Sequence, residues 1–181
     1  MDPYRLVLPA EEHLEQVRAY RAEFLAADSS MDGAGPLRRY ADPADWLAAV
    51  RSYADPATVP EGKVRASQFL CLRQADDRLL GMIQIRHTLN DYLRNYAGHI
   101  GYSVRPSERR KGVATWMLAA VLPFCREIGL ERVMIACEPW NQGSRRTILA
   151  NGGVYTQTVH EPEEDIDLEQ YWIELCGRRL S

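Results

Sequence analysis

The stretch GHIGYSVRPSERRKGVA at residues 98–114 joins a β-rich segment to the start of a helix and is the most informative part of the chain. GHIGYSV is typical of a strand, and a helix is expected over Val113–Ile128, ending at Gly129. The first amides of a helix have no partner inside it, and the helix dipole adds partial positive charge there. The connecting loop is therefore predicted to bind an anion, most naturally a phosphate or pyrophosphate.

Several residues of this loop suit a phosphate. Gly112 has no side chain where a phosphate would approach the backbone, and Ala114 keeps a nearby position small. Arg109, Arg110 and Lys111 add positive charge. The spacings of the ATP-binding P-loop and of the dinucleotide-binding GxGxxG motif are both missing. By itself the loop fits a phosphate site or a basic first helical turn without a ligand.

Length, composition and charge limit the class of protein. The 181 residues fit one domain, predicted to span 1–181, and 46% hydrophobic residues are enough for a core. A net charge of -3 argues against non-specific nucleic-acid binding. No apolar run approaches the roughly 20 residues that cross a bilayer, so no membrane partner is expected. The N-terminus lacks the pattern of a secretory signal, and the cytoplasm is the expected location.

Cysteines and histidines give no sign of a metal. Cys71, Cys125, Cys137 and Cys176 are scattered along the chain and form no CxxC pair. Zinc sites need clustered ligands, so buried and reduced thiols are expected instead. The four histidines are equally dispersed. No metal site is predicted.

Hydrophobic period and turn signals predict the element order β-α-α-β-β-β-α-β-α-β-β, typical of a mixed α/β domain. The expected strands are YRLVL (4–8), SQFLCLRQ (67–74), RLLGMIQIRH (78–87), GHIGYSV (98–104), ERVMIACE (131–138), VYTQTVH (154–160) and QYWIEL (170–175). The expected helices cover 11–27, 113–128 and 142–149, and a further helix is expected with Asp42 as its N-cap and Pro43 at its first position. Residues 28–40 and the polar region around 90–95 are expected to be loops.

Arg109-x-x-Gly112-x-Ala114 resembles the coenzyme A motif Gln/Arg-x-x-Gly-x-Gly/Ala of the GNAT superfamily of N-acetyltransferases. The resemblance runs in register from Gly98 to Gly153: ERVMIACEPWNQGSRRTILANGG is similar to that superfamily's fifth strand and Asn-x-x-Ser helix. HTLNDYLRNYAGHIGYSVRPSERRKG also resembles a bacterial subgroup of predicted acetyltransferases. The resemblance implies a central, mostly antiparallel twisted sheet of about 6–7 strands, flanked by helices, with the fourth and fifth strands splayed apart.

The resemblance also implies acetyl-CoA as co-substrate. The pantetheine arm would lie between the splayed strands, on the backbone of Tyr102, Ser103 and Val104. The pyrophosphate would bind the amides of Arg110, Lys111, Gly112, Val113 and Ala114, with the Thr115 hydroxyl nearby. Contacts to the cofactor arm are expected from Asn141 and Ser144. Asn141 suits the N-cap of a helix equally well, and both roles can coexist.

The sequence departs from the family pattern at the general acid. Many members carry Tyr four residues after the Ser position, where this chain has Ile148, which cannot donate a proton. Tyr155 is a candidate substitute, with an ordinary strand tyrosine as the alternative, and Tyr102 is a second candidate. His99 and Glu138 are candidate bases, because an amine must lose a proton before it attacks. A structural role for His99, or a water chain in place of a base, would serve as well.

In the superfamily, the acceptor pocket is built largely from the first two helices and the loop joining them, here carrying Asp28, Asp32, Arg38 and Arg39. Another wall is expected from His87, Asn90 and Tyr92. The predicted reaction moves an acetyl group from acetyl-CoA to a primary amine of a small molecule or peptide. An inactive coenzyme A-binding sensor or interaction module and a general nucleotide-phosphate binder are the alternatives. A homodimer is compatible with the resemblance.

Overall fold

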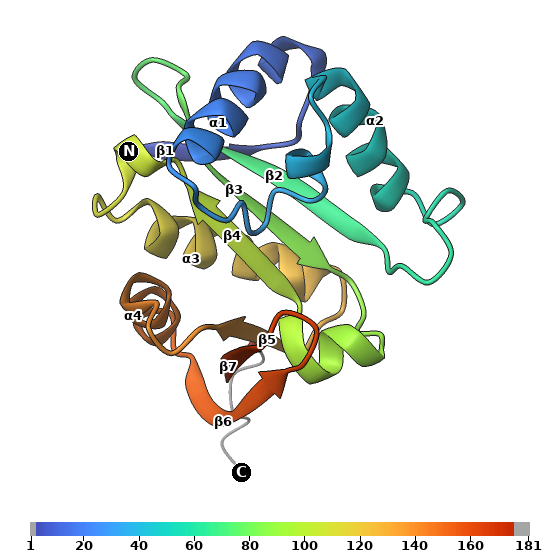
Figure 1. Cartoon of the computed structure of the whole chain (residues 1–181), viewed down its shortest axis with the longest axis vertical. Coiled ribbons are helices and arrows are strands. Elements are labelled where there is room, and N and C mark those ends of the chain that lie inside the picture. The colour runs from blue at the N-terminus through green and yellow to red at the C-terminus, as the bar shows by residue number, and fades with distance from the viewer. Residues whose placement is uncertain (1–2, 176–181) are drawn as a thin grey trace.

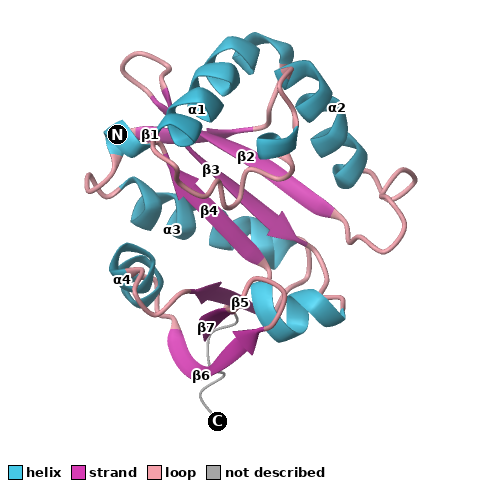
Figure 2. Ribbon diagram, in the orientation of Figure 1, coloured by secondary structure: helices cyan, strands magenta, loops and turns pink. Residues whose placement is uncertain are grey.

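The computed structural model describes residues 3–175 and contains two antiparallel sheets (Figures 1 and 2). The first sheet has the order β1-β2-β3-β4, formed by Tyr4–Val7, Ala66–Arg73, Leu79–Arg86 and Ile100–Val104. The second has the order β5-β7-β6, formed by Arg132–Cys137, Ile166–Glu174 and Val154–Glu161. The α-helices are α1 (Leu14–Ala26), α2 (Pro43–Ala54), α3 (Val113–Glu127) and α4 (Gln142–Ala150).

Helices α1 and α2 cover one face of the first sheet, and α3 covers the other (Figure 1). Side chains alternate between the faces of a strand, so adjacent residues such as Leu70 and Cys71 enter different cores. The core under α1 and α2 includes Tyr20, Phe24, Trp46, Leu72 and Met82. The core under α3 includes Met117, Val121, Ile83 and Ile85, and it reaches the second sheet through Ile135, Ile148 and Tyr171. This second core holds the two sheets together.

The facing edges β4 and β5 touch at one joint and then diverge. His99 N donates to Met134 O at 2.8 Å, and Met134 N donates to His99 Nδ1 at 2.9 Å. Gly98, next to this joint, has φ +72°, and a Cβ there would lie 2.4 Å from Met134 O. Only glycine fits so close to the neighbouring backbone. The sheets are therefore pinned at residues 98–99 and open beyond them.

The predicted fold class is confirmed, with the sheet divided into parts of four and three strands. The expectation of a loop over 90–95 is wrong in part, because a π-helical turn, η3, covers Leu93–Ala97. Leu93 is buried, and Asn90 Oδ1 accepts a hydrogen bond from Leu93 N at 2.9 Å. The polar side chains of this segment, such as Asp91 and Arg94, are exposed around the turn. The single domain over 1–181 stays a prediction.

Other expectations concern single residues. Asp42 caps α2 by accepting from Ala44 N at 2.9 Å. Cys71, Cys125 and Cys137 are buried and unpaired, and Cys176 lies outside the described residues. Within residues 3–175, no helix has the length and apolarity needed to cross a bilayer.

Candidate active site

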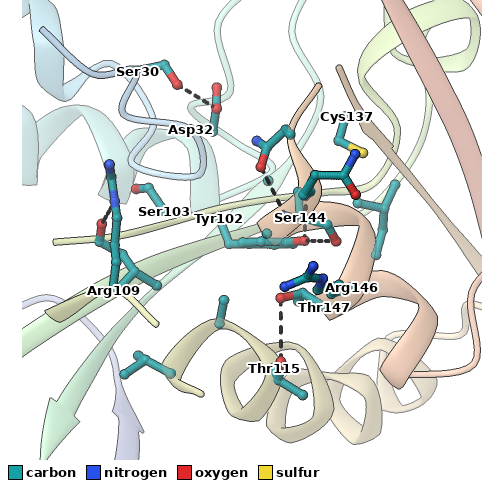
Figure 3. A pocket seen from close by; sticks show the side chains of 18 of the residues that line it. Ser30, Asp32, Tyr102, Ser103, Arg109, Thr115, Cys137, Ser144, Arg146 and Thr147 are labelled. Carbon is teal, nitrogen blue, oxygen red and sulfur yellow. Dashed lines mark hydrogen bonds between the residues drawn. The ribbon is translucent and has the colours of Figure 1, made fainter. Parts of the chain in front are cut away.

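A cleft of about 830 Å³ lies between β4 and β5. Its walls come from both strands, the loop leading into α3, the first turns of α4, and residues 29–32 of the loop between α1 and α2. Figure 3 shows Asp32 at one end of this cleft and Thr115 at the other, with Tyr102 and Ser144 between them. The volume is in the usual range for a small-molecule or cofactor site.

The register of β3 and β4 decides which β4 residues turn their backbone toward the cleft. His99 O and Arg105 N are hydrogen-bonded to β3 at 2.8 Å, and the pairing between them is regular. In an antiparallel pair the bonded residues alternate with residues whose amides and carbonyls point away. Tyr102 and Val104 therefore present their backbone to the cleft. Ser103 lines the cleft but directs its backbone to β3.

The same rule applies to β5. Leu175 N donates to Glu131 O at 2.8 Å, so alternate residues along β5, including Met134 and Ala136, turn their backbone away from β7 and toward β4. The Met134 groups are occupied by His99, whereas Ala136 faces the cleft beyond the joint. Sequence reasoning did not single out Ala136, because its orientation depends on the register with β7.

The loop before α3 forms a turn of backbone donors. Arg110 has φ +63° and Gly112 has φ +80°, so the chain winds in the left-handed region before the helix begins at Val113. None of the amides from Arg110 to Thr115 has an acceptor in the part of the chain that the structure describes. These free donors and the positive end of the α3 dipole form an anion site.

Two basic side chains of the loop hold it in place. Arg109 Nε donates to Val104 O at 3.1 Å, and its Nη2 donates to Ser29 Oγ at 2.8 Å. Lys111 Nζ pairs with Glu108 at 2.8 Å. Arg109 thus occupies one cleft-facing carbonyl of β4 and ties the α3 loop to the α1–α2 loop. Its contribution to the anion site is charge and support.

Tyr102 and Ser144 form a hydroxyl pair inside the cleft, with their oxygens 2.8 Å apart (Figure 3). Ser144 N donates to Asn141 Oδ1 at 3.0 Å, so Asn141 is the N-cap of α4 and also lines the cleft. Burial raises the pKa of Tyr102, which keeps its hydroxyl protonated. Cys137, the last residue of β5, also lines the cleft, and burial raises the pKa of its thiol to about 11.

The family model described as the acetyltransferase (GNAT) family matches residues 36–152, well over half of the chain. The chain belongs to the GNAT acetyltransferase family. It is therefore an acyltransferase, as the sequence predicted. A comparison with curated protein sequences found no match.

Solved structures share the fold of this GNAT protein. The ribosomal-protein-S5-alanine acetyltransferase from Vibrio fischeri superimposes with a TM-score of 0.74 at 15% identity, covering 96% of this chain and 94% of that one. RimJ from Mycobacterium smegmatis, in complex with a CoA disulfide, gives 0.70 at 18% identity over 94% and 81%. The microcin C7 self-immunity acetyltransferase MccE, in complex with acetyl-CoA and AMP, gives 0.69 at 19% identity over 96% and 93%.

The structure separates the three catalytic candidates of this GNAT protein. Glu138 lines the cleft at the end of β5 and is half-buried. His99 is 6% exposed and sits at the strand joint, where burial lowers its pKa to about 4. Tyr155 is 50% exposed on β6 and bonds Thr158. Neither His99 nor Tyr155 is among the described residues that line the cleft. Ile148 is wholly buried in the core.

Of the residues expected to bind the acceptor, the structure places some in the cleft and others outside it. His87 Nε2 bonds Ser67 Oγ at 2.8 Å beside α3, in a separate hollow. Asn90 stabilises the η3 turn, and Tyr92 is 47% exposed. None of these three is among the described residues lining the cleft. Asp32 does line it, and its carboxylate accepts from Ser30 Oγ at 2.9 Å. Within residues 3–175, no cluster of His, Cys, Asp and Glu fits a metal ion.

Proposed function

We propose that this GNAT protein transfers the acetyl group of acetyl-CoA to a primary amine of a small molecule or peptide, by direct attack in a ternary complex. One observation carries the proposal: a turn of unpaired amides adjoins a cleft whose β4 wall presents backbone donors and acceptors. The turn suits a pyrophosphate, and the strand edge suits an extended arm with amide groups. Coenzyme A contains both parts, in that order.

The cofactor would lie along the whole cleft. The amides of Arg110 to Ala114 would hold the pyrophosphate, with Thr115 at its side, since these donors have no acceptor among residues 3–175. The pantetheine amides would pair with Tyr102 and the Val104 amide on β4, and with Ala136 on β5. Its sulfur end would then lie near the Tyr102–Ser144 pair, between the loop and Asp32. MccE and RimJ, which share the fold, bind acetyl-CoA and a CoA disulfide respectively.

The reaction forms a C–N bond and breaks the C–S bond of the thioester. A neutral amine attacks the carbonyl carbon, and its surplus proton passes to Glu138, directly or through water. The departing thiolate accepts a hydrogen bond from the hydroxyl of Tyr102 or Ser144, which line the cleft. Ile148 has no donor and is buried in the core. A thiolate is a good leaving group, so stabilisation by a protonated hydroxyl is sufficient. Positioning both substrates in one cleft supplies much of the remaining rate enhancement.

Other parts of the proposal concern the acceptor and the surroundings. The fold relative from Vibrio fischeri carries the name of a ribosomal-protein alanine acetyltransferase, which makes a peptide amine a reasonable acceptor class to test. The cytoplasmic location and the homodimer stay predictions.

The test combines binding and turnover. Calorimetry is expected to give tighter binding of coenzyme A than of ATP or NAD, and acetyl-CoA is expected to release thiol only when an amine acceptor is present. Tight coenzyme A binding without thiol release from any acceptor would favour the inactive sensor or interaction module. Tighter binding of ATP or NAD would contradict the cofactor assignment.

A further inference from the structure

Arg86, at the end of β3, is a half-buried cation with no acidic partner in the described part of the chain. Its Nη1 donates to Gly98 O at 3.1 Å and to Ala97 O at 3.4 Å. Among residues 3–175, no carboxylate oxygen lies within 4.0 Å of its guanidinium nitrogens. Burial lowers the pKa of Arg86, which reflects the cost of holding this charge away from water. A guanidinium held partly away from water gains from an anionic partner, and a ligand anion would supply one.

The guanidinium lies next to the acceptor end of the cleft. A Cβ placed on Gly101, a residue that lines the cleft, would lie 3.6 Å from Arg86 Nη2 and 3.1 Å from Gly33 N. Gly33 of the α1–α2 loop packs closely against Gly101, since a Cβ on Gly33 would lie 2.1 Å from Gly101 O, and Arg86 lies beside the same residue. Arg86 is not among the described residues that line the cleft, but with glycine at position 101 no side chain of that residue lies between the guanidinium and the cleft.

Asp32 lies at the same end. Its carboxylate lines the cleft. Its negative charge raises the pKa of both Arg86 and Tyr102, which favours the charged form of Arg86 and the neutral form of Tyr102. It forms no ion pair with Arg86 within 4.0 Å. The carboxylate of Asp32 thus lines the cleft, and the guanidinium of Arg86 adjoins the cleft beside Gly101 without pairing with that carboxylate. This arrangement suits a ligand that carries a positive charge for the Asp32 carboxylate and a negative charge for the Arg86 guanidinium.

We propose that the acceptor is a small amino-carboxylate of the α-amino acid type, with its carboxylate bound by Arg86 and its ammonium group held by Asp32 before it loses a proton. The assignment rests on the proposed function. Arginine binds carboxylates through parallel N–H donors, and the Nε and Nη2 groups of Arg86 have no protein acceptor among the described residues. A peptide N-terminus carries no carboxylate beside its amine and would leave Arg86 unpaired.

The first experiment compares the twenty common amino acids with their α-amides as acceptors, measuring thiol release from acetyl-CoA. Each amide keeps the amine and side chain but removes the negative charge. The best amino acid is expected to exceed its amide at least tenfold in kcat/KM, mainly through KM. Equal rates, or preference for an amide or a peptide with the same first residue, would overturn the assignment.

Two further outcomes are distinguishable. If acetyl-CoA binds in calorimetry but no amino acid releases thiol, the acceptor assignment is wrong and the cofactor site stands. If acetyl-CoA does not bind, the proposed function itself fails and takes this assignment with it.

The second experiment changes the cation. Arg86→Gln is expected to abolish the preference for acid over amide, and Arg86→Lys is expected to keep part of it. Arg94→Gln is the matched control, because Arg94 is an exposed arginine of η3 whose Nη2 donates to Leu89 O at 3.2 Å, and its loss should leave the preference intact. Equal loss of acid and amide turnover in Arg86→Gln would make Arg86 a support for residues 97–98 and refute the acceptor role.

Discussion

Replacing Gly112 by Asn and by Asp separates the shape of the anion site from its charge. Gly112 has φ +80°, and a Cβ there would meet no atom within 4 Å. A Cβ at this position therefore carries a backbone cost of about 1–2 kcal/mol but no clash, and Asn and Asp tolerate this conformation best among residues with a side chain. The two variants share that cost and differ by one negative charge.

The charge term can be worked out from Coulomb's law. A carboxylate about 6 Å from one phosphate charge is repelled by roughly 1–3 kcal/mol for an effective dielectric constant between those of water and a protein surface. That range corresponds to about 5- to 150-fold in affinity. Gly112→Asp is therefore expected to bind coenzyme A about 5- to 150-fold more weakly than Gly112→Asn, even though both fold with similar stability.

Calorimetry at several salt concentrations measures this difference. It should shrink as salt rises, because the two charges are near solvent and become screened. Pantetheine, which lacks the phosphates, is the matched ligand and should bind both variants equally. Equal coenzyme A affinity of the Asp and Asn variants at low salt would refute the placement of the pyrophosphate on this loop.

Three further results are expected. Tyr102→Phe and Ser144→Ala should each lower kcat about tenfold with little change in KM for acetyl-CoA, since each removes a hydroxyl near the leaving sulfur; unchanged kcat in both would remove the pair from the reaction. Gly98→Ala should destabilise the protein by about 2–4 kcal/mol in urea unfolding because its Cβ would lie 2.4 Å from Met134 O, whereas Gly62→Ala, with a similar φ but open space, should cost about 1 kcal/mol. Between pH 6.5 and about 4 the unfolded state binds a proton at residue 99 that the buried His99 of the folded state does not, so the free energy of unfolding should decrease by up to about 3 kcal/mol as the pH is lowered through this range. His99→Asn can accept the same hydrogen bond without titrating and should flatten this part of the pH–stability profile. An identical profile for the variant would contradict the assignment.

The sequence alone determined the features that depend on neighbouring residues. The anion loop is one of these, because Gly112 and the start of a helix at Val113 place free amides together whatever surrounds them. The N-caps Asp42 and Asn141 are others, since each accepts from an amide two or three residues along the chain. The order of the elements predicted the fold class, and the resemblance of Arg109-x-x-Gly112-x-Ala114 to the GNAT coenzyme A motif predicted the family.

Only the tertiary structure decided which candidates share the cleft. Glu138 and Tyr102 line the cleft and His99 does not, because His99 is hydrogen-bonded to Met134 at the point where β4 and β5 meet and the cleft ends. Ser144, the hydrogen-bond partner of Tyr102, is 42 residues away along the chain. That no carboxylate within residues 3–175 pairs with Arg86 likewise depends on how distant segments are placed. Strand register decides which backbone groups face the cleft, because the hydrogen bonds between β3 and β4 turn alternate residues of β4 toward the cleft or away from it. The sequence around each residue does not show which of the two alternate sets faces the cleft.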